Sequence, residues 1–146
     1  MDSDLRALWF MGRPSDIRPG GTIGPTRNHD ELSDNAVLTP EKYRQYAGHS
    51  WTERVTKVEP ERLLASEWDG GDNGVVTITL AAEGERTRLV LVHSGISDRA
   101  GAINFAGGWD SHLAVLERRL RGVAVPDFWA LHAAAETQAR AALQAD

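Results

Sequence analysis

The sequence contains no cysteine among its 146 residues. This absence excludes disulfide bonds, thiolate zinc sites and cysteine nucleophiles, and it favours a cytoplasmic location. No segment approaches the about 18 uninterrupted apolar residues that indicate a membrane-spanning helix. Residues 1–11 include both acidic and basic side chains among their apolar positions, whereas a signal peptide begins with basic residues and continues with an uninterrupted apolar run. We therefore expect neither export nor contact with a membrane.

Positive charge is also in short supply. The chain has 16 Lys and Arg against 21 Asp and Glu, a formal net charge of −5. Proteins that hold phosphate backbones by bulk electrostatics have the opposite balance, so nucleic acid is not an expected partner. The remaining composition, 41% hydrophobic and 25% charged, is that of an ordinary globular chain of one domain.

The first third of the chain is mostly loop. A short apolar helix is expected over residues 4–11, ended by Gly12 and Pro14. Pro19-Gly20-Gly21 then opens a strand, and Pro40 begins a small helix that runs to Tyr46. Between them, residues 28–39 form a long surface loop, which is a candidate lid.

The middle of the chain predicts an antiparallel meander. Four β-rich runs are separated by short turns and cover residues 51–58, 62–68, 74–81 and 86–94. In the third run Val76, Ile78 and Leu80 alternate with the residues of the other face. The predicted sheet therefore has one apolar face.

The last third predicts two helices. Trp109, Leu113, Leu116 and Leu120 recur at helical spacing, which predicts an amphipathic helix from Gly107 that lies on the sheet. A second helix over residues 127–144 has its bulky side chains only near its start, so its far end is expected to be exposed. Helices segregated to one face of an antiparallel sheet define an α+β fold.

The order of several motifs resembles the START-like (SRPBCC) superfamily, and within it the homologues of the activator of the heat-shock-protein-ninety ATPase. The resemblance covers about half of the chain, over residues 51–122. It rests on residues 58–64 leading to Glu67-Trp68, on residues 74–80 and 85–95, and on Gly107-Gly108-Trp109 followed by the leucine stripe.

The resemblance implies a helix-grip fold, in which a curved antiparallel sheet wraps around a long C-terminal helix and encloses a mostly apolar cavity. Residues 1–122 are expected to form this domain without the opening strand and first helix of the family, and residues 123–146 to form an additional helix. The missing strand leaves a sheet edge to be covered. We expect either a homodimer or the docked C-terminal helix to cover it.

Catalytic and metal-binding motifs are weak in this sequence. The five histidines do not have the spacing of metal ligands, and no serine lies in a nucleophile-elbow sequence. The glycines Gly70, Gly71 and Gly74 lie between two expected strands and predict a hairpin turn, not a phosphate-binding loop. No metal, cofactor or catalytic residue is therefore assigned. His93 and His112 are the candidates for an acid/base pair, but His112 precedes the inward Leu113, so we expect the two rings not to converge.

The aromatic residues are the strongest functional signal. Five tryptophans are many for this length, and rings with a few polar groups are typical of a pocket for a small apolar ligand. The expected ligand-binding residues are Trp9, Phe10, Tyr43, Trp51, Trp68, His93, Phe105, Trp109 and His112.

The expected function is thus that of a small-molecule ligand-binding module for an apolar, aromatic or lipid-like compound, and binding is favoured over catalysis. Two alternatives stay open, because one fold hosts many functions. One is a small cyclase or lyase of the polyketide-aromatase type, which needs a polar dyad in the cavity. The other is a chaperone-associated interaction protein, which needs a surface for a large partner.

Overall fold

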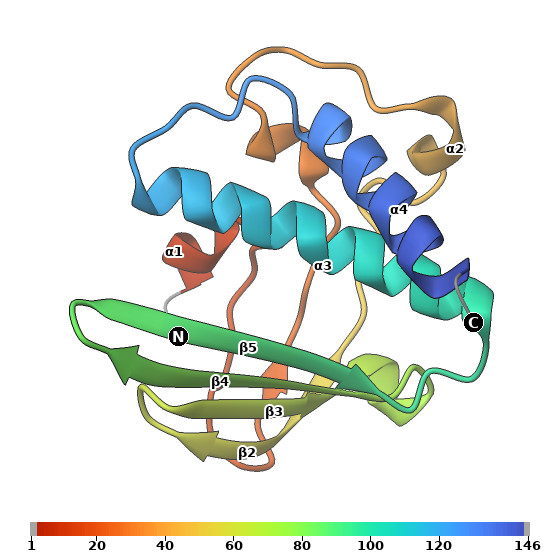
Figure 1. Ribbon diagram of the computed structural model, residues 1–146. Coiled ribbons are helices and arrows are strands. Elements are labelled where there is room, and N and C mark those ends of the chain that lie inside the picture. Colours follow the sequence, from red (N-terminus) through yellow and green to blue (C-terminus); the bar gives the residue numbers. More distant parts are fainter. Residues whose placement is uncertain (1–2, 145–146) are drawn as a thin grey trace.

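A five-stranded antiparallel sheet forms one layer of the protein, whose computed structural model describes residues 3–144 (Figure 1). The strands follow chain order across the sheet. They are β1 (Thr22–Ile23), β2 (Glu53–Glu59), β3 (Leu63–Glu67), β4 (Val75–Glu83) and β5 (Arg86–Ser94). The four longer strands match the predicted runs within two residues at each end, and β1 follows Pro19-Gly20-Gly21 as expected.

Helices form the layer above the sheet. The long helix α3 (Arg99–Leu120) crosses the sheet, and α4 (Phe128–Gln144) packs on the side of α3 that faces away from the sheet (Figure 1). Asp98 caps α3 by accepting a hydrogen bond from the Gly101 N–H. The predicted α+β helix-grip fold is confirmed. Within residues 3–144 no helix combines the length and apolarity needed to cross a membrane.

Short elements complete the layers. They are α1 (Ser3–Ala7), the 3-10 turns η1 (His29–Leu32) and η2 (Trp68–Gly71), and α2 (Glu41–Arg44). Buried Arg6 of α1 donates to the Met11 and Arg13 carbonyls and to Ser15 Oγ. These bonds hold the N-terminal segment beneath α3, so Phe10 and Met11 become part of the core.

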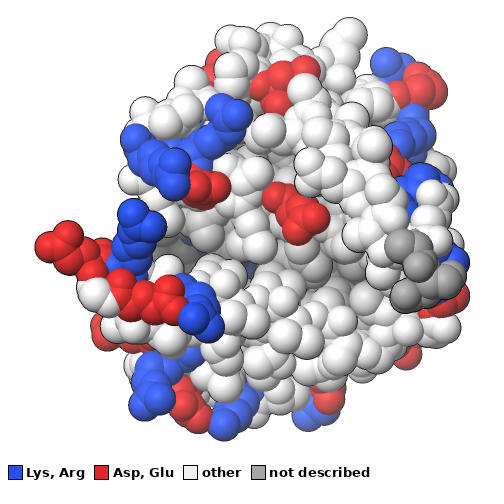
Figure 2. All heavy atoms as spheres, viewed as in Figure 1, with Lys and Arg blue, Asp and Glu red and all other residues white. Residues whose placement is uncertain are grey.

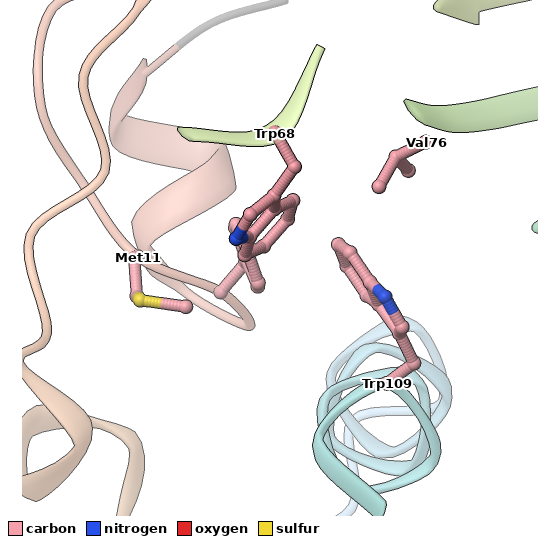
Figure 3. Packing of buried hydrophobic residues seen from close by; sticks show 5 residues of the cluster. Met11, Trp68, Val76 and Trp109 are labelled. Carbon is pink, nitrogen blue, oxygen red and sulfur yellow. The ribbon is translucent and has the colours of Figure 1, made fainter. Parts of the chain in front are cut away.

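The predicted alternation in the sheet is present. Val76 of β4 is buried in the core with Trp68 and Trp109 (Figure 3), whereas Val90 and Val92 of β5 are 43% and 52% exposed on the opposite face. In the described part of the chain β5 pairs only with β4 and is one edge of the sheet. The helix α4 docks on α3 and not on this edge. A homodimer over β5 stays a prediction.

The predicted leucine stripe of α3 is wrong in its register. Leu120 is 78% exposed, and Leu113 and Leu116 are only half-buried. The buried positions instead form two faces of the helix. Trp109 faces the sheet, and the His112 ring lies between Phe10 and Phe128. Gly107, Ser111 and Val115, at spacings of four, form the face beneath α4.

The far half of α4 also differs from its expected exposure. Ala135 and Ala139 are buried, and a side chain at Gly107 of α3 would come within 3.0 Å of the Glu136 backbone. Small residues on both helices therefore allow close approach. At the other end Phe128 is fully buried among Leu32, Val115 and Val125.

Candidate functional site

A cavity of about 400 Å³ lies between α3, the end of the sheet, the loop over residues 27–48 and the first turns of α4. Its volume falls in the usual range of small-molecule pockets, about 300–1,000 Å³. The lining combines aromatic rings with polar side chains, so it is less apolar than the resemblance implied. The residues lining it are Phe10, Met11, Arg27, Asn28, His29, Asp30, Thr39, Tyr43, Tyr46, Ala47, Gly48, Trp51, Trp68, Asn104, Phe105, Gly108, Trp109, His112, Trp129 and His132.

One wall is a group of interlocked aromatic rings. Trp68, at the end of β3, and Trp109, on α3, meet edge to face at 5.2 Å (Figure 3). Phe10 stacks on Trp109 at 5.2 Å, and Trp51 lies 5.3 Å from Trp68. Rings held from several sides keep their orientation, so this wall is preorganised.

The opposite wall brings α2 and α4 together. Tyr43 of α2 stacks on Trp129 of α4 with ring centroids 4.9 Å apart. The Lys42 ammonium pairs with the Glu136 carboxylate at 2.8 Å, and this pairing raises the pKa of Lys42 and lowers that of Glu136. The loop that closes the cavity is thus attached to the last helix.

Seven of the nine expected ligand-binding residues line this cavity. They are Phe10, Tyr43, Trp51, Trp68, Phe105, Trp109 and His112. Trp9 does not line it and instead borders a separate void of about 30 Å³ near Glu53. His93 lies behind the wall, because the Trp109 indole N–H donates to its Nδ1 at 3.1 Å. Its Nε2 then donates to the Asn73 carbonyl at 2.7 Å.

His112 is more central than predicted. It is buried in the middle of α3, and its Nδ1 donates to the Trp9 carbonyl at 2.9 Å, which leaves Nε2 as an acceptor. Burial, aided by the nearby His29, lowers the pKa of His112 to about 3. As expected His93 and His112 do not form a pair, since both nitrogens of His93 are bonded elsewhere.

His29, not His93, is the imidazole beside His112. The two ring centroids lie 5.2 Å apart, and the His29 ring stacks on Phe128 at 5.1 Å. Burial and the Arg27 charge lower the pKa of His29 to about 4. Its ring nitrogens make no hydrogen bond to any residue in the range 3–144. A neutral His29 therefore offers one donor and one acceptor to a bound molecule.

The charged groups of the lining are Arg27 and Asp30. The Arg27 guanidinium lies over the rings of Tyr46 and Trp51, 5.1 and 5.4 Å from their centroids. Burial lowers its pKa. The exposed Asp30 carboxylate accepts a short hydrogen bond from the Thr39 hydroxyl.

A buried carboxyl group lies outside the cavity, next to the void near Trp9. Glu53 of β2 accepts a hydrogen bond from the Ser66 hydroxyl at 2.9 Å, and burial raises its pKa to about 7. The charge of Arg6 and the Trp51 indole oppose that rise. The Trp51 indole N–H lies close enough to Glu53 to lower the pKa of that carboxyl group. Neither this N–H nor Glu53 Oε1 makes a hydrogen bond of normal geometry in the described residues.

The sequence did not predict which residues of the loop and of α4 would line the cavity. Residues 28–39 were the candidate lid, but Leu32 is fully buried and Asp34 pairs with Arg119 at 2.7 Å, so this part is a fixed wall. The Gly-, Pro- and Asp-rich composition marked the loop as functional without marking Arg27 or His29. Trp129 and His132 belong to the expected additional helix, which has no place in the family's cavity, so the sequence did not predict them as part of the lining.

Metal ligation has no geometric basis in the described residues. No group of three or more His, Cys, Asp or Glu side chains within residues 3–144 is arranged to hold an ion. His29, His112 and His132 come near one another, and their rings pack against the aromatic rings of Phe128 and Trp129. The cluster therefore belongs to the cavity wall.

Solved structures share this fold. A Bordetella parapertussis protein encoded by gene BPP1335 is 38% identical, with a TM-score of 0.78 over 95% of this chain and 74% of that one. The crystal structure of CalU16 from Micromonospora echinospora is 20% identical, with a TM-score of 0.68 over 98% of this chain and 76% of that one. The similarity to CalU16 shows the fold alone. No curated protein matches the chain.

The family model described as "Activator of Hsp90 ATPase homolog 1-like protein" matches residues 2–121. That range spans the sheet and the whole of α3, which are the elements that define the helix-grip fold. Together with the similarity to the Bordetella protein, this match means that the chain belongs to the activator of Hsp90 ATPase homolog 1-like family, within the START-like superfamily.

Proposed function

We propose that the protein binds a small amphipathic molecule with an aromatic or lipid-like body in the cavity beneath α3. The observation that carries the proposal is the cavity itself. About 400 Å³ is bounded by rings that hold one another in place, with polar groups at only part of the lining. An aromatic wall with a few converging polar groups is what ligand pockets of this size have in common.

Gly108 provides a direct test. It lies on α3 in the cavity lining, and a Cβ atom placed there has no neighbouring heavy atom within 4 Å outside the backbone of its own helix. A series Gly108→Ala, Gly108→Leu and Gly108→Phe would therefore fill the cavity in steps without straining the backbone. Gly24, outside the lining and equally open, gives the matched control Gly24→Leu.

The probe for this series is the neutral fluorophore N-phenyl-1-naphthylamine, whose emission rises in apolar surroundings. We expect binding to the natural protein, graded loss along the Gly108 series, and little change in Gly24→Leu. Melting temperatures and circular dichroism verify that each variant is folded. Equal binding by natural protein and Gly108→Phe, or no binding at all, would refute the proposal. If the probe binds as expected, native mass spectrometry of the protein purified from its own cells would identify the natural ligand.

An acid/base enzyme of the cyclase or lyase type is the second candidate. The adjacent neutral rings of His29 and His112 favour it, since they border one cavity. Their pKa values of about 4 and 3 make both imidazoles weak bases, whereas efficient general bases have a pKa near the working pH. Binding is therefore the better supported function. Loss of a turnover in both His29→Gln and His112→Gln, with the fold intact, would reverse this order.

A chaperone-associated role is the third candidate and rests on the family description. It requires an external surface and not the cavity. The Gly108→Phe variant separates the two ideas, because filling the cavity would leave stimulation of an Hsp90-type ATPase unchanged. In Figure 2 the lower right part of this face is largely uncharged, whereas charged side chains gather along its left side and an acidic side chain lies near its centre.

A further inference from the structure

Among residues 3–144, Arg27 is a half-buried cation without a counter-ion. Its guanidinium lies over Tyr46 and Trp51 and lines the cavity. In this described part of the chain its side chain makes no hydrogen bond and no ion pair, whereas its backbone N–H donates to the His49 carbonyl and its carbonyl accepts from the Gly48 N–H. A guanidinium carries five N–H donors, so all five are left for solvent or a bound molecule.

The surroundings of Arg27 do not neutralise it. Asp30, the carboxylate of the same lining, is exposed and bonds to Thr39. His29, two residues along, stays neutral because burial and the Arg27 charge lower its pKa. The rings of Tyr46 and Trp51 attract the guanidinium charge, but they accept no conventional hydrogen bonds.

We infer that the ligand carries an anionic group, a carboxylate or a group of equivalent geometry, which the Arg27 guanidinium binds while the aromatic body lies against Trp51 and the rings behind it. This inference rests on the proposed function and specifies its ligand class. A planar guanidinium matches a carboxylate in a two-bond arrangement that a lysine does not reproduce. The neighbouring His29 imidazole supplies a further donor for the same group.

Three probes of nearly equal shape test the charge preference. They are 2-naphthoate, its neutral amide 2-naphthamide, and the cation 2-naphthylmethylammonium. Four of the five tryptophans line the cavity, so quenching of tryptophan fluorescence reports binding of each probe. We expect naphthoate to bind about tenfold or more tightly than the amide, as a charge-assisted hydrogen bond predicts. Its affinity should fall as NaCl is added, while that of the amide should not.

Variants assign the preference to one residue. Arg27→Met keeps the apolar stem over the rings and should remove the advantage of naphthoate while leaving naphthamide binding in place. Arg27→Lys should retain only part of the advantage. Arg86→Met is the matched control, because Arg86 is exposed at the start of β5 and outside the lining, and it should behave like the natural protein.

Each other outcome overturns the inference. If Arg27→Met weakens naphthoate and naphthamide equally, the arginine acts only as packing. If the cationic probe binds best, Asp30 and not Arg27 sets the ligand charge. If the neutral fluorophore and the amide bind but naphthoate shows no advantage, the binding function survives and only its anionic specificity fails. If no probe binds, the proposed function fails together with this inference.

Discussion

The indole N–H of Trp109 on α3 donates a hydrogen bond to Nδ1 of His93 on β5 over 3.1 Å. This bond fixes the His93 tautomer, since Nδ1 must accept and Nε2 must carry the proton that it donates to the Asn73 carbonyl. The long helix is therefore tied to the edge strand by a partly buried polar contact. The two rings also explain why His93 is structural, because neither nitrogen is left for a substrate.

A double-mutant cycle should measure this contact. His93→Leu leaves the indole N–H unpaired, and Trp109→Phe leaves Nδ1 unpaired, so each single variant loses stability. The double variant should lose less than the sum, with a coupling of about 1 kcal/mol in urea unfolding. Strictly additive losses would show that the hydrogen bond contributes nothing to stability.

Two adjacent glycines on α3 should respond to alanine in opposite directions. Gly107→Ala places a methyl group 3.0 Å from the Glu136 Cα, and the backbone of a packed helix yields little, so we expect a loss of about 1–2 kcal/mol. Gly108→Ala meets open space and should gain up to about 1 kcal/mol from helix propensity. Chemical denaturation of both variants measures the difference. Equal effects at the two positions would contradict the close approach of α4 to α3.

Acid should destabilise the fold through His29 and His112. In the folded protein their pKa values are about 4 and 3, below the ordinary 6.5. Between these pKa values and pH 6.5 the two rings therefore bind more protons in the unfolded chain than in the folded protein. Their contribution to stability is complete above pH 6.5 and is lost as pH falls, at up to about 1.4 kcal/mol per pH unit for each ring. Unfolding measured from pH 8 to pH 4 should show this slope.

The variant His112→Asn isolates one ring, because its amide can donate in place of Nδ1 to the Trp9 carbonyl. It should flatten the dependence of unfolding free energy on pH below 6.5, even where its stability at pH 7 is lower. The exposed His49→Asn is the control and should keep the natural slope. An unchanged slope in His112→Asn would mean that the buried ring is not the group that titrates.

Glu53 should act in the opposite sense. In the folded protein its pKa is about 7, above the ordinary 4.5, so folding favours the protonated carboxyl group. Its contribution to the free energy of unfolding is complete below pH 4.5 and is lost as pH rises through 7. Glu53→Gln keeps an acceptor for Ser66 and removes the ionisation. It should be more stable than the natural protein at pH 8 by roughly 1–2 kcal/mol, since Arg6 loses an attraction that offsets part of the gain.

The measurement for Glu53 is the difference in unfolding free energy between variant and natural protein at pH 8 and at pH 4.5. The gain should appear at pH 8 and shrink at pH 4.5, where the natural carboxyl group is protonated in the folded state and about half protonated in the unfolded chain. Glu85→Gln, on the exposed β4–β5 turn, is the control. If Glu53→Gln gained more stability at pH 4.5 than at pH 8, Glu53 would not be the group with the raised pKa.

The strands were predictable because their signals are local. Alternation placed Val76 inward, and the turn residues between runs set the hairpin connections. Most of the aromatic lining followed as well, since Trp51, Trp68 and Trp109 lie where the sheet and its helix must meet. The resemblance to a family then supplied the curvature of the sheet around α3, which no local pattern contains.

The register of α3 was not predictable from its hydrophobic residues. The leucines suggested one stripe, but the helix is buried on two sides, and the side toward α4 consists of Gly107, Ser111 and Val115. Small residues permit the shortest distance between helices, so a weakly hydrophobic face became the buried one. His112 was consequently predicted at a margin and lies at the centre.

By itself, the amino-acid sequence determined the succession of strands and helices, the α+β class and the aromatic character of the interior, because these depend on periodicity and side-chain type. Tertiary structure alone decided which polar groups enter the cavity. Arg27 and His29 come from a loop and His132 from α4, and contacts such as Asp34 with Arg119 and Lys42 with Glu136 bring those segments to α3 and to each other. Such contacts join residues about 85 and 94 positions apart, a separation over which the chain carries no local signal.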